Sequence, residues 1–111
     1  MALIALCEQS AIEPGTALRV EAVERLFAVF NVDGTFYVTD DYCSHGPGSL
    51  SAGFIDGDVV ECDFHGGCFH IPSGKAVKAP CSEPVQTFAV TLRDGKVWIE
   101  FEAIPVASTP P

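Results

Sequence analysis

The residues best suited to chemistry are two pairs of cysteine and histidine near the middle of the chain. One residue separates Cys43 from His45, two separate Cys62 from His65, and sixteen lie between the pairs. Such spacing lets a tight loop or turn direct both members of a pair at one centre. Thiolate and imidazole together suit zinc, iron or an iron–sulfur cluster. The pattern therefore predicts a metal centre.

Glycines follow the histidine in each pair and refine this prediction. The four residues are Gly46, Gly48, Gly66 and Gly67. Glycine permits positive φ and lets the backbone approach a cofactor closely, so that N–H groups can point at cluster sulfurs. A tetrahedral zinc site needs the same ligand types but has less reason for two matched glycine loops.

Strand patterns dominate the rest of the chain and must position these pairs. Asp33-Gly34 and Asp94-Gly95 each separate two apolar runs, which is a strong hairpin signal. Alternation of apolar and polar residues in the two runs that flank Asp94-Gly95 predicts half-buried antiparallel strands, and no segment has a helical period over three turns. The expected strands are 16–23, 25–32, 35–39, 85–92 and 96–101.

The organisation we predict is a single all-β domain of two parts. Residues 1–41 and 85–103 form an antiparallel β-sandwich base, into which a loop-and-hairpin subdomain of about residues 42–84 is inserted. The subdomain is rich in Gly, Ser and Pro. Residues 104–111 have little to bury and are expected to fray.

Composition and charge exclude several classes of function. The 111 residues include 6 basic and 15 acidic side chains, a formal net charge of −9 that would repel nucleic acid and anionic membranes. The apolar run 2–7 is too short to span a bilayer, and no basic residue precedes it as in a secretory signal. Five cysteines, an odd number, argue against a disulfide framework. We therefore expect a soluble cytoplasmic protein.

The acidic residues are concentrated around the candidate ligands. No Lys or Arg occurs between Arg25 and Lys75, whereas that interval holds seven acidic residues. A solubilising surface is one interpretation, and a docking face for a basic partner is the other. The acidic residues are Asp33, Asp40, Asp41, Asp56, Asp58, Glu61 and Asp63.

The stretch "CSHGPGSLSAGFIDGDVVECDFHGGCFHIPSGKA" and the following "KAPCSEP" resemble the Rieske ferredoxins of bacterial aromatic-ring-hydroxylating oxygenases. The resemblance covers nearly the whole chain. It implies the all-β Rieske fold and one 2Fe–2S cluster. By this resemblance Cys43 and Cys62 would bind one iron, and His45 and His65 the other.

The implied function is electron transfer without bond chemistry. A flavin-containing, NAD(P)H-dependent reductase would reduce this ferredoxin, which would reduce a terminal dioxygenase and act as a monomer. Two alternatives stay open. One is a zinc-binding structural or interaction module. The other is the small Rieske subunit of an assimilatory reductase, although some relatives there lack the ligands and this chain has all four.

The resemblance also indicates a low reduction potential. Relatives in respiratory and photosynthetic complexes carry a disulfide at the positions of Gly48 and Phe64, and hydroxyl groups at those of Gly67 and Phe69. Each missing hydroxyl donor leaves the added electron less stabilised. We therefore expect a potential near the low end of the Rieske range, about −150 mV rather than about +300 mV.

Five further residues are assigned no ligand role. We expect Cys68 to face away from the cluster, and Cys81 to lie in a proline loop that covers it. Cys7 is expected in the core of the first strand. His70 is expected at the surface or in a turn, and Trp98 to cover the base on the side opposite its neighbours.

Overall fold

The computed structural model describes residues 2–41, 49–62, 66–78 and 84–101. Within these ranges every regular element is a strand or a single turn of 3-10 helix, and none of the helices could cross a membrane. The elements are β1 (Ala2–Glu8), η1 (Gln9–Ala11), β2 (Thr16–Ala22), β3 (Arg25–Val32), β4 (Thr35–Asp40), η2 (Leu50–Ala52), β5 (Phe54–Asp56), β6 (Val59–Glu61), β7 (Cys68–His70), β8 (Ala76–Lys78), β9 (Thr87–Phe88), β10 (Val90–Arg93) and β11 (Lys96–Phe101).

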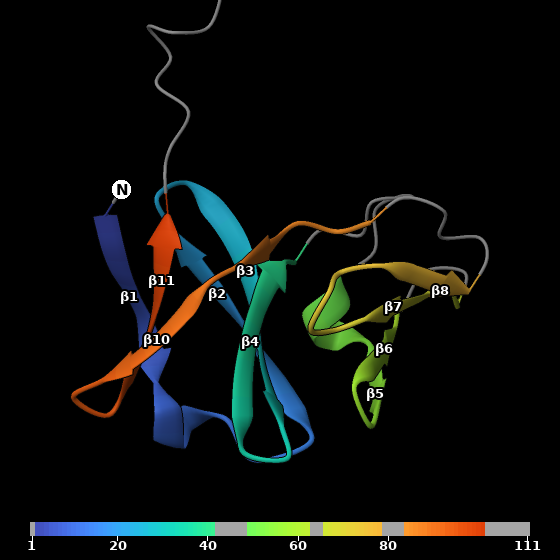
Figure 1. Ribbon diagram of the computed structural model, residues 1–111, viewed down its shortest axis with the longest axis horizontal. Helices are drawn as coiled ribbons and strands as arrows, with labels where there is room; N and C mark the ends of the chain where they lie inside the picture. The colour runs from blue at the N-terminus through green and yellow to red at the C-terminus, as the bar shows by residue number, and fades with distance from the viewer. Residues whose placement is uncertain (1, 42–48, 63–65, 79–83, 102–111) are drawn as a thin grey trace, which may run out of the picture.

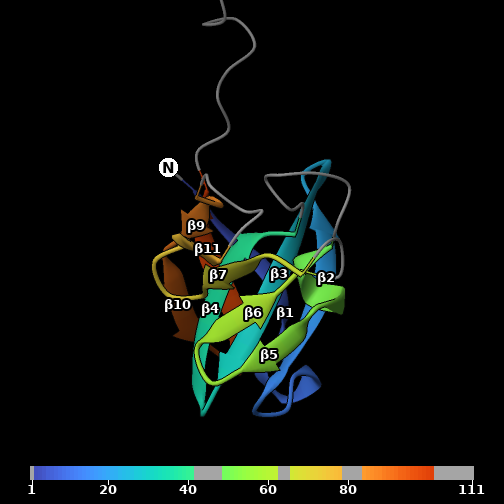
Figure 2. The same cartoon turned by 90° about the vertical axis from the view of Figure 1, so that its right-hand side faces the viewer.

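The described strands form three antiparallel sheets, which confirms the predicted all-β fold. Their orders are β1-β11-β10, β2-β3-β4-β9 and β5-β6-β7-β8. The first two sheets combine strands from both ends of the chain, whereas the third consists entirely of residues 54–78. Figure 1 shows this third sheet beside the other two, and Figure 2 shows it in front of them. The candidate ligand Cys62 directly follows a strand of this third sheet.

Strand β3 lies at the centre of the molecule and is covered on both faces. Phe27 and Val29 pack in the core that it shares with β1 and β11. Ala28 and Phe30 point the other way, into the core beneath the third sheet. All four side chains are fully buried. The continuous apolar run "FAVF" therefore reflects two cores, one on each face of the strand.

Both predicted Asp-Gly hairpins are confirmed. Asp33-Gly34 joins β3 to β4, and Asp94-Gly95 joins β10 to β11, with positive φ at all four residues. A third hairpin turn, Val23-Glu24, has φ values of 46° and 61° and joins β2 to β3. Because a β-branched residue rarely adopts positive φ, the sequence did not indicate this turn. The strand expected over 16–23 therefore ends at Ala22.

The strand expected over 85–92 is wrong, because the structure divides it at Ala89. β9 pairs with β4 in the second sheet, whereas β10 pairs with β11 in the first. The Ala89 carbonyl still accepts a hydrogen bond from the Glu100 N–H at 3.1 Å. Phe88 and Val90 nevertheless pack against the same core, which lies between the two sheets. A strand that changes sheets at a corner keeps its alternation, so the sequence pattern could not reveal the break.

Trp98 of the base lies as expected, and Cys7 does so in part. Val97 and Ile99 are fully buried, whereas Trp98 between them is half-buried and its indole N–H donates to the Arg93 carbonyl at 3.1 Å. Cys7 lies half-buried at the edge of the core. Burial raises the pKa of the Cys7 thiol, and the neighbouring Glu8 carboxylate raises it further.

Candidate metal centre

Of the four predicted ligands, Cys62 lies within the described residues, and Cys43, His45 and His65 lie outside them. The Cys62 side chain is 2% exposed and belongs to the core beneath the third sheet. Within the described ranges no three His, Cys, Asp or Glu side chains are placed to hold a metal ion. The ligand set therefore stays a prediction, and the structure informs on the residues that border each motif.

The segment 42–48, which contains the first motif, is bordered by residues that bind one another. The Leu50 N–H donates to the Asp41 carbonyl at 2.8 Å. The Asp41 carboxylate accepts from the Ser51 N–H at 2.8 Å and from the Ser49 hydroxyl at 2.7 Å. The two borders of segment 42–48 therefore lie next to each other, and the buried carboxylate of Asp41 joins them.

The segment 63–65, which contains His65, is bordered by backbone pairing instead. The Cys62 N–H donates to the Gly67 carbonyl at 2.7 Å. Directly beyond this bond Glu61 pairs with Cys68 in the β6–β7 ladder. Gly66 has a φ of +73°, a conformation that glycine adopts without the strain of a side chain. The second motif is thus presented by the end of a hairpin.

The segment 79–83, which contains Cys81, is bordered by Lys78 at the end of β8 and by Pro84. Just beyond Pro84 the Val85 N–H donates to the Gly74 carbonyl at 2.8 Å. Gly74 has a φ of +75°, and a Cβ atom there would run into the Val85 carbonyl oxygen. This contact requires glycine in the β7–β8 turn.

One hydrophobic core contains residues from the borders of all three segments. Leu50 follows segment 42–48, Cys62 precedes 63–65 and Val85 follows 79–83, and all three side chains are buried in the core that contains Phe30 and Phe69. Gly53 also packs tightly against the strand that leads to Cys62, because a Cβ atom there would meet the Glu61 carbonyl oxygen. The fold therefore positions the borders of both ligand motifs at one site.

The structure also places two residues to which we assigned no ligand role. Cys68 is buried, and its Sγ lies 3.8 Å from the Gly66 carbonyl oxygen. His70 lies in strand β7 and not in a turn. Its Nε2 lies 3.0 Å from an Asp58 carboxylate oxygen, and its Nδ1 lies 2.7 Å from the Ser73 hydroxyl. His70 thus links the β5–β6 and β7–β8 turns.

Asp41 is the residue of this site that sequence reasoning missed. The sequence placed it among seven acidic residues with no individual role. An available signal was its position two residues before Cys43, with Ser49 and Ser51 on the far side of the motif. Asp side chains in such places often accept hydrogen bonds from nearby backbone N–H groups and hydroxyls.

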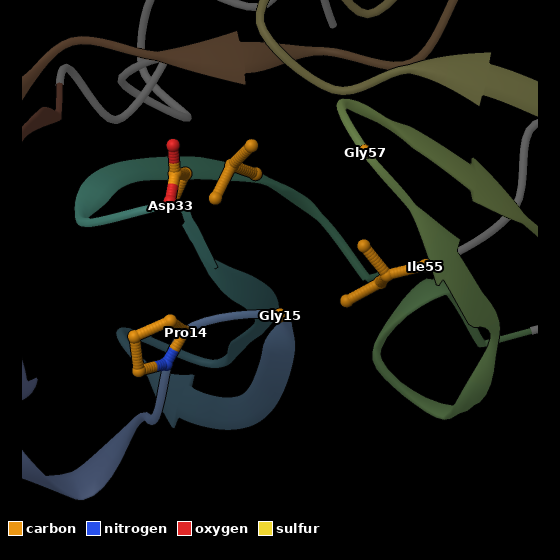
Figure 3. A pocket seen from close by; sticks show the side chains of 6 residues that line it. Pro14, Gly15, Asp33, Ile55 and Gly57 are labelled. Carbon is orange, nitrogen blue, oxygen red and sulfur yellow. The ribbon is translucent and has the colours of Figure 1, made fainter.

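A groove of about 310 Å³ separates the turn of the β5–β6 hairpin from the base. Figure 3 shows Ile55 and Gly57 on one side of it and Pro14, Gly15 and Asp33 on the other. Cys62 does not line this groove, because it follows the opposite end of strand β6. With one carboxylate among its lining residues, the groove has no recognisable metal chemistry.

Comparison with known families identifies the class of protein. The Rieske 2Fe-2S domain family matches residues 2–89, which is most of the chain. The chain therefore belongs to the Rieske family, and its cofactor is one Rieske-type 2Fe–2S cluster. This assignment decides against the zinc-binding module.

Curated relatives identify the kind of Rieske protein. Ferredoxin CarAc of Metapseudomonas resinovorans is 43% identical over 98 residues, covering 87% of this chain and 92% of CarAc. The ferredoxin component of the p-cumate 2,3-dioxygenase system of Pseudomonas putida is 40% identical over 106 residues, covering 94% and 90%. These proteins are electron-transfer components, and this chain is a ferredoxin of the same kind.

Solved structures agree with this result. The Sphingomonas yanoikuyae B1 ferredoxin superposes with a TM-score of 0.87 at 39% identity, covering 91% of this chain and all of that one. A chain from the complex of reduced oxygenase and oxidised ferredoxin in carbazole 1,9a-dioxygenase gives 0.83 at 42% identity, covering 87% and 91%. A nitrite reductase small subunit, at 21% identity and a TM-score of 0.76, shares the fold alone.

Proposed function

We propose that this ferredoxin carries single electrons in the cytoplasm from a flavin-containing, NAD(P)H-dependent reductase to a terminal aromatic-ring-hydroxylating dioxygenase. The observation that carries the proposal is the match, over most of the chain, to ferredoxin components of such systems. A related ferredoxin is seen in complex with its oxygenase. The protein itself breaks and forms no substrate bonds.

The ligand set of this proposal is Cys43 and Cys62 on one iron, and His45 and His65 on the other. Two features of the structure support it. The chain enters or leaves both motifs beside the same core, at Leu50 and Cys62. The Cys62 N–H also donates to the Gly67 carbonyl, which joins the two borders of segment 63–65. When bound, the cluster supplies one-electron transfer, and this chain supplies the ligands and the electrostatic environment.

The surface around the second motif supports docking of a basic partner. Asp56 and Glu61 are exposed in the β5–β6 hairpin, and Phe54, which pairs with Glu61, is 68% exposed. The Glu61 carboxylate lies 3.3 Å from the position of a Cβ atom on Gly66, so this patch continues into the motif. An exposed aromatic side chain beside carboxylates suits a small, transient electron-transfer interface.

A reconstituted turnover assay tests the function. The purified protein is mixed with a candidate flavin reductase, NAD(P)H, a candidate oxygenase and its aromatic substrate, and the product is measured with and without the ferredoxin. We expect brown protein that bleaches on reduction and product that depends on the ferredoxin. Colourless protein that contains zinc instead of iron would overturn the proposal.

A salt series tests the docking surface in the same assay. The rate of oxygenase reduction should fall as ionic strength rises, because screening weakens attraction between charged surfaces. Phe54→Ser should raise the KM for ferredoxin roughly threefold to tenfold, as removal of an interface aromatic does. Leu92→Ser is the matched control, since Leu92 is 48% exposed but lies in β10 of the base. Rates that do not depend on salt, or equal effects of both substitutions, would contradict this surface.

A further inference from the structure

Asp41 is a buried carboxylate directly before the first ligand motif. Asp41 is 2% exposed. Burial of a carboxylate is unfavourable unless its oxygens accept hydrogen bonds or pair with a cation. The two ion pairs among the described residues, Arg25–Asp40 and Asp58–His70, do not include it. Its partners among the described residues are therefore neutral groups, which stabilise the negative charge without cancelling it.

The bonds of Asp41 join three parts of the chain. Its N–H donates to the Leu26 carbonyl of β3 at 3.1 Å, and its own carbonyl accepts from the Leu50 N–H. One carboxylate oxygen accepts from the Ser51 N–H and the other from the Ser49 hydroxyl. Every carboxylate oxygen thus has a donor from the far border of segment 42–48. Asp41 holds both borders of the first motif against the base.

Asp41 is also close in sequence to the ligands that we propose for the cluster. It precedes Cys43 by two residues, and two residues of fully extended chain span at most about 7 Å. A negative charge on a buried side chain near the cluster would oppose the addition of an electron. The exposed carboxylates of the surface are screened by solvent and act less strongly.

We infer that Asp41 is a positioning residue for the first ligand motif and that its buried charge lowers the reduction potential of the cluster. The inference rests on the proposed ligation by Cys43 and His45. It assigns to one side chain two effects that substitutions can separate, because an asparagine preserves the shape of the residue and removes its charge.

The test compares Asp41→Asn with Asp41→Ala in the cluster-loaded protein. In Asp41→Asn the amide can still accept from Ser51 and can donate to the Ser49 hydroxyl. Iron content and visible absorbance should therefore be retained, and the midpoint potential in an EPR-monitored titration should rise. Asp41→Ala removes the bonds to Ser49 and Ser51, so its iron content per chain should fall. Asp56→Asn, which neutralises an exposed carboxylate of β5, is the control and should leave the potential nearly unchanged.

Ser49→Ala provides a second variant with the opposite expected sign. It keeps the charge of Asp41 and removes one donor to it, so the potential should fall below that of the wild type. If Asp41→Asn does not fold, the midpoint potential of Ser49→Ala alone tests whether the charge of Asp41 lowers the potential. An unchanged potential in the loaded Asp41→Asn or Ser49→Ala protein would overturn the inference. Wild-type protein without a 2Fe–2S spectrum would instead overturn the proposed function.

Discussion

The borders of segment 42–48 are joined by the side chain of Asp41 together with one backbone bond, from the Leu50 N–H to the Asp41 carbonyl, whereas the borders of segment 63–65 are joined by the backbone of the β6–β7 hairpin alone. The side-chain part of the first closure depends on the identity of a single residue. The second depends on strand pairing, which many sequences could maintain, and on glycine at a position of positive φ. The comparison teaches that the borders of the two predicted ligand motifs can be altered independently. Substitutions at the first motif should change electrostatics, and those at the second should change the fold.

The largest effect is expected at the ligand itself. Cys62→Ala should abolish the 2Fe–2S spectrum, because the remaining ligands cannot hold both irons. Cys68→Ala is the matched control, since Cys68 is also a buried cysteine of the same hairpin but has no predicted ligand role. It should keep full iron content. Iron analysis and visible absorbance measure both, and loss of the cluster in Cys68→Ala would show that the ligands are misassigned.

A substitution at Gly74 should have the next largest effect, on the backbone contact between the β7–β8 turn and Val85 at the border of segment 79–83. An alanine there combines positive φ, which costs about 1–2 kcal/mol, with overpacking, which costs about 1–3 kcal/mol. The Cβ atom would meet the Val85 carbonyl oxygen. Gly57→Ala has a similar φ of +63° and open space, so it should carry the first cost alone. Free energies of unfolding in urea measure the difference, and equal losses in the two variants would refute the role of this contact.

The smallest expected effect is a loss of unfolding free energy that differs between the two serines that bind Asp41. Ser49→Ala removes a hydroxyl donor to a buried carboxylate and should cost about 1–3 kcal/mol of unfolding free energy. Ser51→Ala keeps the N–H that binds Asp41 and loses a hydroxyl 3.1 Å from that of Ser49, so it should cost less. Thermal unfolding of both variants checks this order. A larger loss in Ser51→Ala would contradict this order, because Ser49→Ala loses the same hydroxyl pair and the bond to the carboxylate as well.

Local features of the sequence predicted much of this molecule. The Asp-Gly turns are specified by two adjacent residues, and the family motif by a short stretch, so both could be read directly. The Asp41 closure could not, because it joins residues eight and ten positions apart and needs the fold to bury them. The division at Ala89 leaves the apolar alternation intact, and the Val23-Glu24 turn uses residues that turns usually avoid. Cys43, His45 and His65 remain ligands predicted by family resemblance.

The expected low reduction potential is the central claim about function, since it suits an electron carrier. The reason we propose lies at two positions just beyond the second motif, Gly67 and Phe69, whose side chains carry no hydroxyl group. Phe69 is fully buried against Val60 in the core beneath the third sheet, where an apolar ring is well accommodated. The buried charge of Asp41 acts in the same direction from the first motif.

An EPR-monitored redox titration of the wild-type protein at neutral pH tests this claim most directly. We expect a midpoint potential near the low end of the Rieske range, about −150 mV. A midpoint potential above zero would contradict the account.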